Sequence, residues 1–311
     1  MDNFNVQQVE EFLVYLKTVK NKSINTIKGY RIDLNLFYKF LLRNRKNPTA
    51  PDAGEGITID FISKIQLQDI HAFIKYLEVE RKNGASARCR KISSLKSFFE
   101  YLYKIGKIEN NPTLLLEQPK IEKKNPVYLT LKQSQKLLNA VEGDFKERDY
   151  CIITLFLNCG LRLSELINID IEDIREDILT ITGKGNKQRS IYLNAMCLKA
   201  IDEYLKVRNK NLDKIKDKDA LFISKNYVRI SKSGIQKMLE KRMVKAKLDP
   251  KKYTPHKLRH TAATLLYKYG NVDIRSIQEI LGHVSVSTTQ IYTHVDNDTL
   301  RKATASNPLN N

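Results

Sequence analysis

Cysteine is scarce in this chain, and its few cysteines do not follow a metal-binding pattern. The 311 residues include four cysteines, Cys89, Cys151, Cys159 and Cys197, and none forms a C-x-x-C pair. Zinc sites and redox sites usually depend on such close spacing. Because Cys151 and Cys159 lie within an apolar helical pattern, we expect buried free thiols in a reducing cytosol.

Long apolar runs are also missing. A membrane-spanning helix needs about 18 or more consecutive apolar residues, and no such run occurs. The first residues, Met1-Asp2-Asn3, do not begin a signal peptide. We therefore expect a soluble cytoplasmic protein that does not insert into a membrane.

The glycine motifs of nucleotide-binding proteins are incomplete. The Gly183-Lys184 step resembles part of a P-loop, but that motif needs glycine at position 178 and serine or threonine at position 185. These positions hold Ile178 and Gly185, and no G-x-G-x-x-G motif opens a helix after a strand. The sequence therefore does not support nucleotide hydrolysis.

Metal-binding patterns are equally poor. His256 and His260 are four residues apart, as in a helical zinc pair, but Lys257 stands where that motif has glutamate. No cluster of carboxylates with metal-ligand character accompanies them. We predict that the protein requires neither a metal nor a cofactor.

Positive charge, in contrast, is abundant. Lysine and arginine number 54 against 35 aspartates and glutamates, which gives a formal charge of +19 and a pI near 9.6. This excess predicts a polyanionic partner, with nucleic acid before an anionic membrane. The charge is spread along the chain rather than concentrated on one amphipathic helix, which favours nucleic acid, although many of these residues must belong to a solvated surface.

Residues 1–116 are predicted to form a small four-helix domain. Apolar residues recur with helical spacing over 6–20, from Ser23 to before Pro48, over about 67–82 and over about 86–105, and residues 47–58 have loop composition. The last of these helices has a basic side with Arg88, Arg90 and Lys91 beside small serines. Such a face suits DNA phosphates and a solvated surface about equally well.

The rest of the chain predicts a linker, a mixed α/β domain and a tail. Residues 117–127 contain two prolines and alternating charge, as linkers do. Over 128–295 we expect helices near 131–141, 148–158, 195–209, 232–246, 255–269, 273–281 and 286–294. Residues 178–182 and 189–193 alternate as two strands around a glycine-rich tip, which predicts a β-hairpin. The polar residues 296–311 are expected to form a flexible tail.

Histidines gather near the end of the chain. Four of the five lie in the last sixty residues: His256, His260, His283 and His294. Thr254 can cap a helix that has Pro255 at its first position. His256 and Arg259 then share one face of this helix and combine a proton-transfer group with a guanidinium that suits phosphate oxygens. As an alternative, His260 and His294 could merely cap or pack.

Reaction at a DNA phosphate would use these residue types without a metal. A phosphodiester under attack gathers negative charge on its oxygens, and two arginines such as Arg162 and Arg259 can stabilise it. A tyrosine oxygen can serve as the nucleophile, and Lys184 on the hairpin tip can protonate the leaving sugar oxygen. The chain has 15 tyrosines, so chemistry alone does not choose the nucleophile.

Five short motifs follow one another in a specific order. They are Gly160-Leu161-Arg162-Leu163-Ser164-Glu165-Leu166, Lys184 in Thr182-Gly183-Lys184-Gly185, His256-Lys257-Leu258-Arg259-His260, Leu281-Gly282-His283, and Tyr292 nine residues beyond. In this order and spacing they resemble the tyrosine recombinases of the phage integrase family, and most of all the bacterial Xer recombinases. The resemblance covers nearly the whole chain.

This resemblance implies a role for each residue at the phosphate. Tyr292 would attack the scissile phosphate, form a 3′-phosphotyrosine and free a 5′-hydroxyl. The phosphoryl oxygens would be held by Arg162, Arg259 and His283, and Glu165 would orient Arg162.

Two further residues would transfer protons, and four would contact DNA. Lys184 would protonate the leaving 5′-oxygen, and His256 would assist proton transfer from the tyrosine. The expected further DNA contacts are Arg88, Arg90, Lys91 and Lys187. Taken singly, Lys184 and Lys187 could also be solvated turn residues, His283 could simply follow a helix cap, and Tyr292 could pack inward.

The resemblance also implies an architecture and a biological role. The fold would be mainly α with a small β-hairpin or sheet, in which a SAM-like core-binding domain and an α/β catalytic domain form a C-shaped clamp on DNA. Four protomers, identical or of two related kinds, would act on two duplexes, with or without an activating DNA translocase. The role would be to resolve chromosome or plasmid dimers in chromosome partition at cell division. A recombinase of mobile DNA and a non-cutting architectural DNA-binding protein are the alternatives.

Overall fold

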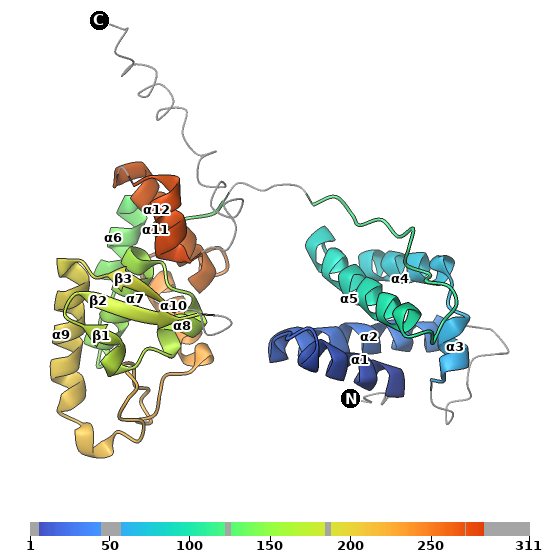
Figure 1. Cartoon of the computed structure of the whole chain (residues 1–311). Coiled ribbons are helices and arrows are strands. Elements are labelled where there is room, and N and C mark those ends of the chain that lie inside the picture. Colours follow the sequence, from blue (N-terminus) through green and yellow to red (C-terminus); the bar gives the residue numbers. More distant parts are fainter. Residues whose placement is uncertain (1–5, 45–56, 122–125, 184–187, 271, 283–311) are drawn as a thin grey trace, which may run out of the picture. The chain divides into compact units, whose positions relative to one another are not determined.

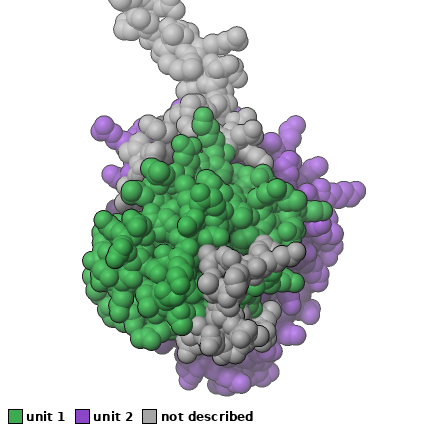
Figure 2. All heavy atoms as spheres, turned by 90° about the vertical axis from the view of Figure 1, so that its right-hand side faces the viewer, with its two compact units in different colours: residues 1–123 green, residues 124–311 purple. Residues whose placement is uncertain are grey.

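The chain divides into two compact units. The computed structural model describes residues 6–44, 57–121, 126–183, 188–270 and 272–282. Unit 1 comprises Met1–Lys123 and unit 2 comprises Lys124–Asn311 (Figure 1; Figure 2). Each unit encloses its own hydrophobic core, as a chain of this length allows.

In the described part of unit 1, all regular secondary structure is helical. Its helices are α1 (Gln7–Thr18), α2 (Ile24–Asn44), α3 (Ile59–Ser63), α4 (Leu67–Val79) and α5 (Ala85–Lys104). Helix α2 packs against α1, α4 and α5, and this packing buries an aromatic core. In that core Phe12 meets Phe98, and Phe37 meets Phe73, edge to face. Such ring pairs add to the stabilisation that burial of apolar area gives.

Unit 2 is built around one helix that is apolar on nearly all sides. Its helices are α6 (Leu131–Asn139), α7 (Lys146–Cys159), α8 (Leu163–Ile167), α9 (Ala195–Asn209), α10 (Lys232–Lys245), α11 (Pro255–Tyr269) and α12 (Ile274–Leu281), with short 3-10 turns at Ile171–Asp173 and Leu212–Lys214. Helix α7 is the buried one, and it packs against α6, α9 and α11. Helices α11 and α12 lie side by side (Figure 1).

A three-stranded antiparallel sheet completes unit 2. Its strands are β1 (Ile174–Arg175), β2 (Ile178–Thr182) and β3 (Gln188–Tyr192), in the order β1-β2-β3. The register pairs Ile178 with Tyr192 and Thr182 with Gln188, which is the predicted hairpin. Its inner face buries Leu179, Ile181 and Ile191 against the core. The glycine-rich tip of this hairpin includes 184–187, which lie outside the described residues.

The structure differs from the sequence predictions in a few places. The short helix α3 was not expected, and its five residues are too few to show a periodic pattern; Thr58 caps it by accepting the Phe61 N–H at 3.3 Å. Pro255 does begin α11, but the Thr254 side chain makes no capping hydrogen bond there. The predicted helix 286–294 and tail 296–311 lie outside the described residues.

Two general expectations concern cysteines and membranes. All four cysteines are buried free thiols, as predicted, and the Sγ atoms of Cys159 and Cys197 lie 4.0 Å apart. None of the helices in the described ranges combines the length and the apolarity that crossing a bilayer demands.

Candidate active site

A sharp turn between two helices positions Arg162. Helix α7 ends at Gly160, whose left-handed φ of 59° redirects the chain, and Arg162 is the N-cap residue of α8. A Cβ at Gly160 would lie 2.5 Å from Cδ2 of Leu281, so the conformation and the packing both require glycine. The Arg162 side chain remains 41% exposed. A ligand can therefore reach its guanidinium from solvent.

Arg259 lies on α11 and is buried between two helix ends. Its Nη1 donates to the Gly160 carbonyl oxygen at 2.7 Å, and its Nη2 donates to the Leu281 carbonyl oxygen at 2.5 Å. These carbonyls belong to the C-terminal ends of α7 and α12, where carbonyl groups have no partner within the helix. Arg259 thus joins the two helix ends and is fixed by them.

The Glu165 carboxylate connects the arginines. It accepts hydrogen bonds from the backbone N–H of Arg162 at 2.8 Å and from Arg162 Nη1 at 2.6 Å, and Nη1 of Arg259 lies 3.8 Å away. Burial acts to raise the pKa of Glu165, but hydrogen bonds and charge from Arg189 and Arg162 overcome it and hold the pKa at about 2. Glu165 is therefore ionised at neutral pH, and it makes the contact that an orienting carboxylate would make.

Sequence reasoning did not single out Arg189, although it is central to this cluster. Arg189 lies on β3 and donates to both Glu165 oxygens, from Nη1 at 3.0 Å and from Nη2 at 2.9 Å. Its Nε donates to the Ile280 carbonyl oxygen at 3.2 Å. Its position in the predicted strand could have indicated this role, because Arg189 shares the inner face with buried Ile191. A charged residue on the inner face of a strand needs a buried partner.

His256 lies in the first turn of α11, next to His260. The centroids of the two rings are 4.7 Å apart. Desolvation, together with the positive charges of Lys257, Arg259 and Arg162, lowers the pKa of His256 below its usual value. The ring is therefore neutral near pH 7 and can accept a proton. Within the described ranges no three His, Cys, Asp or Glu side chains form a group that could hold a metal ion.

Four predicted site residues, Lys184, Lys187, His283 and Tyr292, lie outside the described residues. The described chain nevertheless comes close to one of them in sequence. Gly282 directly precedes His283, and its carbonyl oxygen accepts a hydrogen bond from Arg162 Nη2 at 3.0 Å. The structure thus ties the residue before His283 to one predicted phosphate-binding arginine.

The basic residues of α5 bind partners within unit 1. Arg90 donates two hydrogen bonds to the buried carboxylate of Asp33, and Arg88 pairs with Glu78. Lys91 is buried and donates to the Asn83 side chain at 3.2 Å. These three cations therefore have partners within unit 1, while the Arg90 side chain remains 51% exposed, and their contact with DNA stays a prediction.

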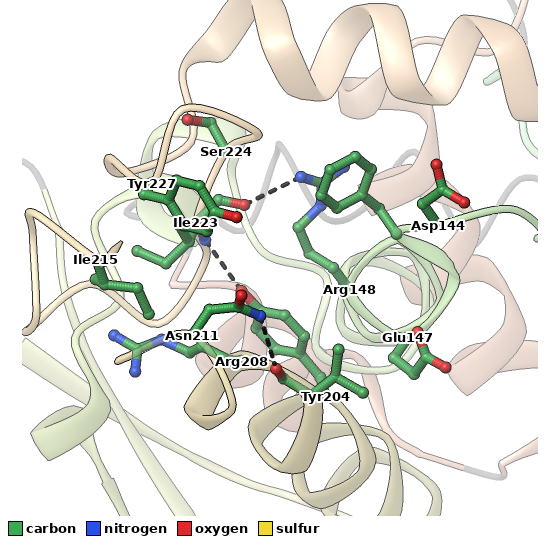
Figure 3. Close-up of a pocket in the computed structure, with 12 residues that line it drawn as sticks. Asp144, Glu147, Arg148, Tyr204, Arg208, Asn211, Ile215, Ile223, Ser224 and Tyr227 are labelled. Carbon is green, nitrogen blue, oxygen red and sulfur yellow. Dashed lines mark hydrogen bonds between the residues drawn. The ribbon is translucent and has the colours of Figure 1, made fainter. Parts of the chain in front are cut away.

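A small pocket in unit 2 is separate from the arginine cluster (Figure 3). Its volume is about 120 Å³, and Phe145, Arg148, Tyr204 and Tyr227 contribute to its walls. Arg148 donates to the Ile223 carbonyl oxygen and the Tyr204 hydroxyl accepts the Ile223 N–H, each at 3.0 Å. These two side chains thus bond to one backbone segment of the protein, and no predicted catalytic residue lines the pocket.

Comparison with known proteins gives matches to both units. Residues 127–299 match the phage integrase family, and residues 9–106 match the N-terminal SAM-like domain of phage integrases. The chain is 54% identical over 308 residues to tyrosine recombinase XerC of Caldanaerobacter subterraneus subsp. tengcongensis. The aligned region covers 97% of this chain and 86% of that protein. It is 36% identical to tyrosine recombinase XerC of Natranaerobius thermophilus, over 92% of this chain and 93% of that one.

Solved structures agree with these matches. The XerA recombinase is 33% identical, with a TM-score of 0.51 and 96% of both chains covered. The XerH site-specific recombinase bound to its difH substrate is 23% identical, with a TM-score of 0.71, over 96% of this chain and 84% of that one. The second likeness shows the fold alone. Taken with the arginine cluster and the two-unit fold, these matches show that the chain belongs to the phage integrase family and is a site-specific tyrosine recombinase of the Xer type.

Proposed function

We propose that this recombinase cleaves and rejoins duplex DNA through a 3′-phosphotyrosine on Tyr292. The observation that carries the proposal is the meeting of Arg162 and Arg259 at the end of α12, where both donate to adjacent carbonyl groups. Ionised Glu165 holds Arg162 there. Two guanidinium groups fixed in this way are suited to the charge that develops on a phosphate under attack.

The remaining steps follow from the chemistry of phosphoryl transfer. The Tyr292 oxygen attacks phosphorus as its proton leaves toward neutral His256, and the bond from phosphorus to the 5′-oxygen breaks. Lys184 supplies the proton that the 5′-oxygen needs. Arg162, Arg259 and His283 hold the phosphoryl oxygens throughout. Because the phosphotyrosine conserves the bond energy, a 5′-hydroxyl of the second strand can reverse the reaction without ATP or a metal.

Several features of the whole chain support DNA as the substrate. The formal charge is +19, and the structurally similar XerH recombinase is bound to its difH substrate. We infer that residues 1–116 form the core-binding domain, 117–127 the linker, 128–295 the catalytic domain and 296–311 a tail. Lys187 would contact DNA beside Lys184.

The biological role that we infer is the resolution of chromosome or plasmid dimers. The similarity to XerC proteins over nearly the whole chain supports this role. Strand exchange between two sites would require four protomers, of this protein alone or with a related recombinase, and an activating DNA translocase would fit the same scheme. A substrate of this kind would place the protein in the cytoplasm.

The test is covalent trapping on a suicide substrate. Nicked duplexes with candidate recombination sites, the difH substrate among them, are incubated with wild-type, Tyr292→Phe and Tyr269→Phe proteins in chelator and without ATP. Tyr269 is 66% exposed on α11 and serves as the matched control. We expect a denaturant-resistant protein–DNA adduct with the wild-type and Tyr269→Phe proteins and none with Tyr292→Phe.

Two results would contradict the proposal. An adduct of Tyr292→Phe as abundant as that of the wild type would show that another residue is the nucleophile. If all three proteins bind the duplexes tightly and none forms an adduct, the architectural alternative would replace the recombinase mechanism.

A further inference from the structure

Arg189 contacts the arginine site from a third element. It reaches from β3 to Glu165 on α8 and to the last turn of α12, and its side chain is only 15% exposed. We propose that Arg189 is a positioning residue of the recombination reaction, which holds Glu165 and the end of α12 where Arg162 and Arg259 can bind the scissile phosphate. This inference rests on the proposed function.

Three arginines bind successive carbonyl groups at the end of α12. Three arginines donate to three successive carbonyl oxygens: Arg189 Nε to Ile280 at 3.2 Å, Arg259 Nη2 to Leu281 at 2.5 Å, and Arg162 Nη2 to Gly282 at 3.0 Å. These carbonyls lack helical partners and carry the negative end of the helix dipole. Of these three arginines, Arg189 is the one to which the proposed function gives no contact with the phosphate. Without it, the helix end would lose the hydrogen bond at Ile280 and keep those from the two catalytic arginines.

Arg189 also packs directly against the turn at Gly282. This glycine has a left-handed φ of 64°, and a Cβ there would lie 2.9 Å from Cδ and 3.1 Å from Nε of Arg189. Glycine therefore serves two purposes, because it adopts the turn conformation and leaves room for the guanidinium. The position of Arg189 is thereby coupled to the conformation of the turn at Gly282.

Glu165 is shared between Arg189 and Arg162. Each of its oxygens accepts one hydrogen bond from Arg189, at 3.0 and 2.9 Å, and one from Arg162, at 2.6 and 2.8 Å. If Arg189 were removed, the buried carboxylate would lose two of these four hydrogen bonds and would bind Arg162 more strongly. Arg189 thus satisfies Glu165 and leaves the Arg162 guanidinium able to turn toward a phosphate.

The experiment separates cleavage from DNA binding in Arg189→Met and Arg189→Lys proteins. Single-turnover adduct formation is measured on a nicked duplex that the wild-type protein cleaves, and affinity is measured on the same duplex. We expect Arg189→Met to form the adduct about 100-fold more slowly, as a small misplacement of catalytic groups would cause, with the wild-type affinity. Arg189→Lys, which keeps one charged contact with Glu165, should recover part of the rate.

Arg229→Met is the matched control for loss of a structural arginine. Arg229 also bonds to carboxylates and carbonyls, those of Asp170, Asp217, Ile167 and Ile169. Its loss should lower the melting temperature and leave the adduct rate of the folded protein unchanged. The positioning role would be overturned if Arg189→Met kept the wild-type rate, or if its rate fell only in proportion to the unfolded fraction.

A double variant keeps the test decisive if Arg189→Met does not fold. Glu165→Gln with Arg189→Met removes the charge and its partner together, which costs less stability than leaving one of them unpaired. Because this protein loses only the contact of Arg189 with the end of α12 relative to Glu165→Gln alone, its adduct rate should be much less than about 100-fold below that of Glu165→Gln, and a full further loss of about 100-fold would overturn the proposal. Absence of any wild-type adduct would instead contradict the proposed function, and the positioning role with it.

Discussion

Arg162 and Arg259 are fixed within the protein by hydrogen bonds to backbone carbonyl groups. Arg259 donates to Gly160 and Leu281, and Arg162 donates to Gly282 and to the Glu165 carboxylate. A guanidinium has five N–H donors in a fixed plane, so several such contacts orient the whole group. Donors that are oriented beforehand stabilise developing charge without reorganisation during the reaction. This orientation in advance is what the two helix ends provide for Arg162 and Arg259.

The lowered pKa of His256 gives a pH prediction. Desolvation and the charges of Lys257, Arg259 and Arg162 favour the neutral ring, so the acid limb of the adduct rate should lie below pH 6.5, the usual pKa of histidine. Lys257→Gln removes one of these charges, so the pKa should rise and the acid limb should move to higher pH. The measurement is the single-turnover rate between pH 5 and 8 for both proteins.

Lys252→Gln is the control for this shift, since Lys252 is not among the charges that lower the pKa of His256. If both variants move the acid limb equally, net charge rather than His256 governs the profile. The stability of the fold should titrate with the same group. A histidine with a lowered folded pKa contributes stability that is present above its unfolded pKa and is lost as the pH falls through the folded value.

At the scale of elements, the periodic patterns of the sequence predicted the helices and the hairpin. Helix 131–141 appears as Leu131–Asn139, helix 148–158 as Lys146–Cys159, and the hairpin as β2 and β3. Contacts between charged groups distant in sequence leave no such pattern. Glu165 with Arg189 is one case, and Arg90 with Asp33 is another. The arginine pair was predicted from motifs. The predicted strand placed Arg189 on its inner face, but only the structure shows that its partner is Glu165.

The junction of α7, α11 and α12 gives a prediction about Gly160. Gly160→Ala would put a Cβ 2.5 Å from Leu281 Cδ2 at a φ of +59°. The left-handed conformation costs about 1–2 kcal/mol, and overpacking of Leu281 adds about 1–3 kcal/mol. Urea unfolding of unit 2 measures the sum. The adduct rate should fall as well, because the Gly160 carbonyl binds Arg259.

Gly143→Ala separates the two contributions. Gly143 has a φ of +85°, and a Cβ added there would have no neighbouring atom within 4 Å, so its substitution should cost the conformational part alone. Equal losses of stability for the two variants would show that Leu281 moves aside freely and that the junction is not tightly packed.

At the scale of the whole molecule, the positive charge is shared by two units with separate cores. In unit 1 the α5 cations are bound by acidic and amide groups, and a groove beside them is lined by Lys28, Arg31, Lys39 and Arg81 with the apolar Ile32. Arg31 pairs with Glu10. Lys28 and Arg81 are exposed, which makes this groove a further candidate in unit 1 for contact with DNA phosphates.

The salt dependence of DNA binding tests this groove. Each phosphate contact that is lost reduces the slope of log affinity against log salt by about 1, so Lys28→Gln with Arg81→Gln should reduce it by about 2 and weaken binding to every duplex sequence. Lys199→Gln with Lys206→Gln changes the net charge equally, on α9, where these lysines pair with Glu203 and Asp202. This control pair should keep the wild-type slope. If both pairs reduced the slope equally, binding would follow net charge, and the groove would have no particular part in it.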